Sequence, residues 1–261
     1  MDYLLVTVTA ILASGVTLFS GFGLGTVLMP AFALFFPVPL AIAGTAIVHL
    51  ASNLFKVALV GRQADRRIVV RFGLPAAVAA VAGASLLNVL SDLPVITIYE
   101  LGAQTHEVTV IRVVIGIVIV AFALLELSPR FAELEFPPRY LTLGGLISGF
   151  FGGLSGNQGA FRSAFLIKSG LDKEAFIGTS VALAVVVDSV RLAVYGLTFY
   201  RESLAVLQSD IAGVVVAAIV AAFFGAYLGA RLIQKVTLRA VRLTVAIAMI
   251  VVGGGLTIGL L

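Results

Sequence analysis

The sequence predicts an all-α polytopic integral membrane protein, built from two inverted-topology repeats that each contain a glycine-broken helix hairpin and three transmembrane helices. Hydrophobic residues make up 61% of the chain and charged residues only 11%, whereas about a quarter of the residues of a soluble domain are charged. Residues 3–55 contain no Asp, Glu, Lys or Arg. As a helix this stretch would cover about 80 Å, which is more than two crossings of a hydrocarbon core about 30 Å thick.

Ten apolar segments follow one another along the chain, and they are the candidate membrane helices: residues 3–20, 24–36, 39–60, 68–90, 108–126, 140–155, 158–168, 174–199, 207–230 and 243–260. Glycine-rich breaks interrupt the first pair, at "SGFGLG" (20–25), and the sixth and seventh, at "GGLSGNQG" (152–159). Each interrupted pair forms either a re-entrant hairpin or two crossings. Both alternatives add an even number of crossings, so the sidedness of the remaining loops is the same.

Basic residues identify the cytoplasmic loops. Most of the 17 Lys and Arg residues fall in four loops that the crossing parity places on one side: Arg62, Arg66, Arg67, Arg71, Arg130, Arg139, Lys168, Lys173, Arg231, Lys235, Arg239 and Arg242. By the positive-inside rule this side is cytoplasmic, in a bacterial-type inner (plasma) membrane. The loop on the opposite side carries Asp92, Glu100 and Glu107 without a basic residue, and both termini are expected outside.

The chain repeats itself within a single transporter domain, 1–261. "SGFGLG" at Ser20 returns as "SGFFGG" at Ser148, and "NLFKVALVG" at Asn53 aligns with "DSVRLAVYG" at Asp188. We therefore predict an N-terminal repeat, 1–127, a cytoplasmic linker, 128–139, and a C-terminal repeat, 140–261. An odd number of crossings in each half inverts the second copy, an arrangement typical of secondary transporters. Chance matches between two apolar helical halves are the alternative explanation.

The two halves resemble the TauE/SafE family of membrane transporters, also called the sulfite exporter or toluenesulfonate uptake family. The clearest stretches are "GGLISGFFGGLSGNQGAFRSAFLIKSGLDKEAFIGTS" (144–180) and "VDSVRLAVYG" (187–196), with a weaker copy in "FSGFGLGTVLMPAFALF" and "AGTAIVHLASNLFKVALVG". The first copy has single glycines where the family often has a cluster, and the second lacks the proline that the first has at Pro30. The resemblance implies alternating-access transport of sulfite, sulfonates, sulfoacetate or related organic anions, in either direction.

Three cations are expected near the centre of the membrane: Lys56, Arg162 and Arg191. Because a charge at the bilayer centre costs at least about 2.5–3.5 kcal/mol, such residues usually have a function. Lys56 and Arg191 are equivalent in the two copies, and Asn53 and Asp188 precede them by three residues, on the same helix face. An oxyanion between the two helices would satisfy both cations.

The glycine-rich breaks are predicted to complete an anion site. A broken helix at membrane depth leaves free N–H groups, and these, with the positive end of the helix dipole, bind anions. The predicted substrate-binding residues are Lys56, Arg191, Arg162, Asn157, Gln158, Ser155, Asn53, Gly156, Gly23 and Gly25. We expect the second hairpin to discriminate between substrates and the first mainly to close the cavity.

Several structural alternatives compete with this interpretation. Asp188 and Arg191 could neutralise each other, Arg162 could extend to the cytoplasmic face, and the glycines could serve close helix packing alone. Asp188 and His49 are an acid and an imidazole within the two site helices, so they are the candidates for proton coupling. His49 could equally be an ordinary hydrogen-bonded interior residue.

Other classes of function have less support. The chain has no Cys, no HExxH and no GxSxG motif, so neither an enzyme, a metal site nor a cofactor is predicted. The basic residues form short loops explained by topology, which gives nucleic-acid binding no support. A cation-coupled transporter or a membrane scaffold with purely structural ion pairs remains the alternative function. The expected partners are a small anion and membrane lipid, and a homo-oligomer is left open.

Overall fold

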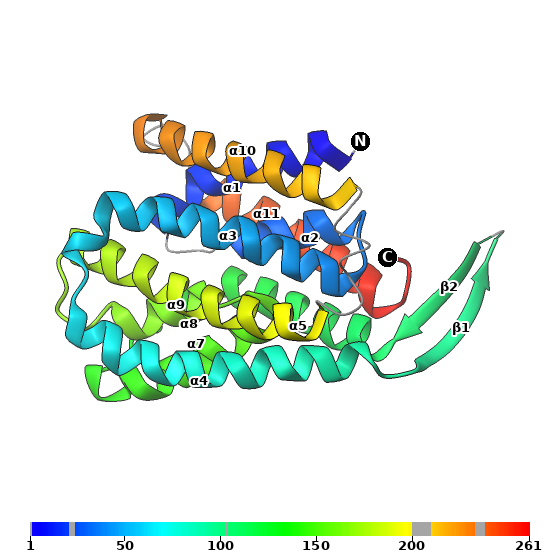
Figure 1. Ribbon diagram of the computed structural model, residues 1–261, viewed down its shortest axis with the longest axis horizontal. Helices are drawn as coiled ribbons and strands as arrows, with labels where there is room; N and C mark the ends of the chain where they lie inside the picture. Colours follow the sequence, from blue (N-terminus) through cyan, green and yellow to red (C-terminus); the bar gives the residue numbers. More distant parts are fainter. Residues whose placement is uncertain (1, 21–23, 103, 200–209, 233–237) are drawn as a thin grey trace.

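The structure is a computed structural model that describes the chain except for residues 1, 21–23, 103, 200–209 and 233–237 (Figure 1). In chain order its elements are α1 (Asp2–Ser20), α2 (Leu24–Ala33), α3 (Val38–Val60), η1 (Gly61–Gln63), α4 (Arg66–Ser91), β1 (Val95–Leu101), β2 (Gln104–Thr109), α5 (Val110–Leu127), α6 (Pro129–Ala132), η2 (Pro138–Tyr140), α7 (Leu141–Ser155), α8 (Gly159–Leu166), α9 (Lys173–Phe199), α10 (Asp210–Leu232) and α11 (Leu238–Thr257). The main helices lie roughly side by side in one bundle.

The bundle has the length and polarity of a membrane protein. Within the described residues, four segments are long and apolar enough to cross a bilayer: Val38–Gln63, Arg66–Ser91, Val110–Leu127 and Lys173–Gly196. On α4, the outward residues Val70, Leu74 and Val78 are about two-thirds exposed and follow one another at one-turn spacing. An apolar stripe of this kind suits contact with lipid. The predicted all-α polytopic membrane class is confirmed.

Glycines bring α4 and α7 into close backbone contact. A Cβ at Gly149 would lie 2.1 Å from the carbonyl oxygen of Ala76, and one at Gly153 would lie 2.2 Å from that of Ala80. Since no side chain fits at such distances, only glycine allows the two helices to approach so closely. For these glycines of α7, close packing is the structural role.

Helices of the first half of the chain pack against helices of the second half. α1, in the first half, packs against α10, and α7, in the second half, packs against α4. α3 packs against α9 and α5 against α11, so like-placed helices of the two halves also meet. These contacts are those expected from two related halves. The inverted-repeat relation and the boundaries 1–127, 128–139 and 140–261 stay predictions.

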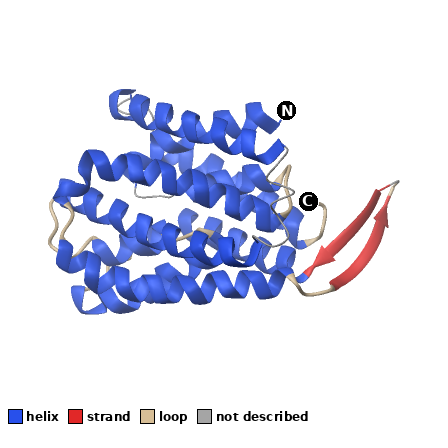
Figure 2. Ribbon diagram, in the orientation of Figure 1, coloured by secondary structure: helices blue, strands red, loops and turns tan. Residues whose placement is uncertain are grey.

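One element differs from the sequence prediction. The acidic loop contains an antiparallel hairpin of β1 and β2, the one sheet of the described chain, which projects from the end of the bundle (Figure 2). The run "VITIY" is rich in β-branched residues, which favour strands. The acidic residues of the segment indicate only its side of the membrane, so the two strands were not predicted. Tyr99 Oη ties the hairpin to the C-terminal end by donating to the Ile258 carbonyl at 2.6 Å.

Candidate functional site

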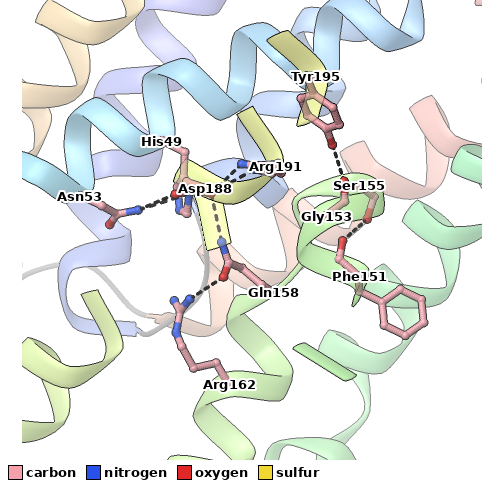
Figure 3. A network of polar contacts seen from close by, with 10 residues as sticks. All are labelled: His49, Asn53, Phe151, Gly153, Ser155, Gln158, Arg162, Asp188, Arg191 and Tyr195. Atoms are coloured by element: carbon pink, nitrogen blue, oxygen red, sulfur yellow. Dashed lines mark hydrogen bonds and ion pairs between the residues drawn. The ribbon is translucent and has the colours of Figure 1, made fainter. Parts of the chain in front are cut away.

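A buried polar cluster lies where α3, α9 and the break between α7 and α8 meet (Figure 3). His49, Asn53 and Lys56 come from α3, Gln158 and Arg162 from the second hairpin, and Asp188 and Arg191 from α9. None of these seven residues is more than 5% exposed. The structure therefore brings together both predicted site helices and the second hairpin.

The Asp188 carboxylate is the centre of the cluster. Its Oδ2 accepts from His49 Nδ1 at 2.6 Å and from Asn53 Nδ2 at 3.3 Å. Its Oδ1 accepts from Gln158 Nε2 and from Arg191 Nε, both at 3.1 Å. Because a carboxylate only accepts, His49 must carry its proton on Nδ1 in this geometry. Asp188 is thus held from α3, from the hairpin and from its own helix.

Arg191 is fully buried but only partly partnered. Its Nη2 lies 2.9 Å from Asp188 Oδ1 as an ion pair. Within the described part of the chain, Nη1 has no hydrogen-bond partner. This nitrogen lies against the hairpin break, since a Cβ at Gly156 would be 2.7 Å from it. One donor face of the guanidinium is therefore directed at the glycine-rich turn.

Gly156 shapes that turn. It ends α7 in the left-handed region, with φ of 83°, and its N–H donates to the Gly152 carbonyl at 3.0 Å. A left-handed C-terminal cap favours glycine, and the absence of a side chain also leaves room for Arg191. Ser148 Oγ donates to the Gln158 carbonyl at 3.0 Å, so α7 also holds the far side of the turn.

Gln158 connects the centre to Arg162. Its Oε1 accepts from Arg162 Nη1 at 3.1 Å while its amide nitrogen donates to Asp188. Arg162 Nε donates to Ser180 Oγ at 2.9 Å, and the residue is only 5% exposed. The guanidinium points into the bundle, which contradicts the alternative that it extends to the cytoplasmic face.

Lys56 is the cation without a counter-charge. It is 4% exposed, and no hydrogen bond or ion pair joins it to another residue that the structure describes. Lys56 therefore has no counter-charge among the residues that the structure describes.

The remaining predicted binding residues differ in how far the structure supports their role. Ser155 Oγ donates to the Phe151 carbonyl of its own helix at 3.2 Å, so this hydroxyl is already engaged. Asn157 is 3% exposed. Gly25 belongs to α2, and Gly23 lies outside the described residues.

Two hydroxyls of the site were not among the predicted binding residues. Ser180 precedes Asp188 by eight residues, and helical spacing places it with Asp188, Arg191 and Tyr195 on the polar face of α9. Tyr195 Oη donates to the Gly153 carbonyl and fastens α9 to α7. Ser180 thus holds Arg162, whereas Tyr195 fixes the packing of α9 on α7.

The cluster combines three cations with one carboxylate. The described residues include no group of three His, Asp or Glu side chains that could hold a metal ion. Hydrogen-bond donors and positive charge dominate instead, a composition that suits an oxyanion.

Comparison with known proteins supplies the family. No curated protein matches the chain. The model of one protein family, described as sulfite exporter TauE/SafE, matches residues 6–256, nearly the whole chain. This is a family of membrane transporters. With its apolar helices, the chain is a multi-pass membrane protein that belongs to the TauE/SafE sulfite exporter family.

Proposed function

We propose that the protein is a secondary transporter that moves a small sulfur-containing or organic anion, such as sulfite, a sulfonate or sulfoacetate, across the bacterial inner membrane by alternating access. Lys56, Arg162 and Arg191 would hold the anion at the break between α7 and α8. Family membership supports the cargo class.

The observation that carries this proposal is the excess of buried positive charge. Lys56, Arg162 and Arg191 are at most 5% exposed, and Asp188 is the carboxylate that contacts the cluster. An uncompensated buried charge costs several kcal/mol, and a bound anion would offset that cost. A bound anion would therefore explain why the excess positive charge is buried.

The broken helix adds a second attraction for anions. α8 begins at Gly159, and the N–H groups of its first turn have no carbonyl of their own helix to bind. They carry the positive end of the α8 dipole. Asn157 adds a buried amide beside them.

The burial of the site supports a transport cycle. The charged side chains are withdrawn from solvent, between helices α3 and α9. A substrate could reach them only when these helices, or the hairpin against them, move apart. Related halves that rock about a central site provide such a movement in other secondary transporters.

Proton coupling through His49 and Asp188 belongs to the same proposal. Their 2.6 Å hydrogen bond places a titratable pair in contact with Arg191. A change in protonation would alter how firmly Asp188 holds Arg191 and thus how free Arg191 is to bind substrate. Uptake should then respond to an imposed pH gradient.

A membrane scaffold is the competing function, and one observation favours it. Asp188 and Arg191 form a closed pair within α9, as a structural ion pair would. That interpretation leaves Lys56 without a counter-charge among the described residues. It also leaves Nη1 of Arg191 without a hydrogen-bond partner among them. The transporter proposal accounts for both.

Transport by the purified protein in proteoliposomes tests the proposal. We expect uptake of radiolabelled sulfite or sulfoacetate that is strongly reduced in Lys56→Met and retained in Lys168→Met. Lys168 is a matched control because its half-exposed ammonium pairs with Glu135, 3.1 Å away and outside the cluster. Uptake of cations but not anions, or equal uptake by both variants, would contradict the proposed anion site.

A further inference from the structure

The charge balance of the buried cluster can be counted element by element. α3 contributes Lys56 and the His49 imidazole, α8 contributes Arg162, and α9 contributes Asp188 and Arg191. The other polar members, Asn53, Gln158, Ser180 and Tyr195, are uncharged. With a neutral imidazole, the three cations and one carboxylate among these described residues leave an excess of two positive charges.

Asp188 forms no ion pair with Lys56. Both of its oxygens are occupied by donors from His49, Asn53, Gln158 and Arg191. In the described chain, Arg191 Nη1 on α9 has no hydrogen-bond partner, and the 4% exposed Lys56 on α3 has no counter-charge. The two cations belong to the two different halves of the protein.

We infer that this site is built for a dianion and discriminates against a monoanion of the same shape. A dianion balances the two excess charges, whereas a monoanion leaves one buried positive charge uncompensated in a medium of low polarisability. If His49 carried a second proton, the excess would rise to three and the preference for the dianion would grow. The inference rests on the proposed function, because it assigns the charge of the anion to the same site.

The test compares probe anions that differ in charge and little else. Sulfate and methanesulfonate form one pair, and sulfoacetate and 2-hydroxyethanesulfonate form a second pair of longer molecules. Each is titrated into the full-length protein in detergent, at constant ionic strength in potassium gluconate, and the dissociation constant follows from the rise in thermal stability. We expect the dianion of each pair to bind at least about tenfold more tightly.

A charge-reducing variant provides the second arm. Lys56→Met keeps a long side chain and lowers the excess from two charges to one, so the dianion preference should shrink to about onefold or reverse. Lys168→Met removes one charge from an exposed ion pair and should retain the preference of the unmodified protein. If Lys56→Met does not fold, the ratio in the unmodified protein still decides the question.

The outcomes separate this inference from the proposed function. Equal binding of both members of each pair, or an unchanged ratio in Lys56→Met, overturns the dianion inference and leaves an anion site in place. Binding of neither dianions nor monoanions overturns both proposals. A dianion preference in both pairs that is lost in Lys56→Met and retained in Lys168→Met supports the inference.

Discussion

Lys56 on α3 and Arg191 on α9 hold corresponding positions in the two halves of the sequence, yet their surroundings differ. Arg191 bonds to Asp188 three residues earlier, through Nε at 3.1 Å and Nη2 at 2.9 Å. Lys56 has Asn53 at the corresponding position, and this neutral amide turns to Asp188 of the other half. One cation therefore has a fixed counter-charge, and the other has none among the described residues.

This difference suggests that the two halves have different roles in the site. α9 carries a pre-formed carboxylate centre that fastens α3 and the hairpin through His49, Asn53 and Gln158. α3 contributes a cation whose charge remains available. In our proposal α9 positions the site and α3 supplies the attraction that an anion satisfies.

The largest expected effect comes from breaking the fixed pair. Arg191→Met leaves Asp188 buried without its main counter-charge, and loss of one partner of a buried pair costs about 3–5 kcal/mol. Sodium dodecyl sulfate titration in mixed micelles, followed by circular dichroism, measures the free energy of unfolding.

A double variant separates this loss from a general effect of truncation. Asp188→Asn combined with Arg191→Met removes both charges, so it should be more stable than Arg191→Met alone. A double variant less stable than either single variant would show that the pair is not the source of the loss.

A smaller effect is expected at the turn that receives Arg191. Gly156→Ala places a side chain at φ of 83°, which costs about 1–2 kcal/mol. Its Cβ would also lie 2.7 Å from Arg191 Nη1 and displace the guanidinium. We expect lower stability in the same titration and a weaker rise in melting temperature on adding sulfite.

Gly254→Ala is the matched control for this variant. No heavy atom lies within 4 Å of the position that a Cβ at Gly254 would take, and this glycine lies inside α11. Alanine favours a helix over glycine by up to about 1 kcal/mol, so stability should stay the same or rise. An equal loss in the two variants would argue against a special role for Gly156.

Much of the fold could be predicted from the sequence because hydropathy and helix length follow directly from the bilayer. The broken helix at 152–159 was predicted from its glycines, and α7 ends there at Gly156. The β-hairpin was not predicted, because the charge of a segment does not indicate whether β1 pairs with β2. Its support depends on contacts such as Tyr99 with Ile258, which are far apart in the sequence.

For the site, repeat matching and intramembrane charge identified the residues but not their partners. Lys56, Arg162, Asp188 and Arg191 do converge, yet Asp188 bonds to four different side chains, which no spacing rule predicts. Ser155 was chosen for its hydroxyl, which bonds to its own helix instead. Residue type indicates what a side chain can do, and packing decides which neighbour it meets.

The smallest expected effect on stability is that of removing Lys56, the cation compared with Arg191. Lys56→Met removes a buried charge that no described residue neutralises, so the free energy of unfolding should change by less than about 0.5 kcal/mol or increase. The same titration, without added anion, measures it beside Arg191→Met. A loss as large as that of Arg191→Met would mean that Lys56 has a structural counter-charge of its own. A small change, together with loss of stabilisation by anions, would establish that the corresponding cations differ in role, one fixing the structure and the other binding the ligand.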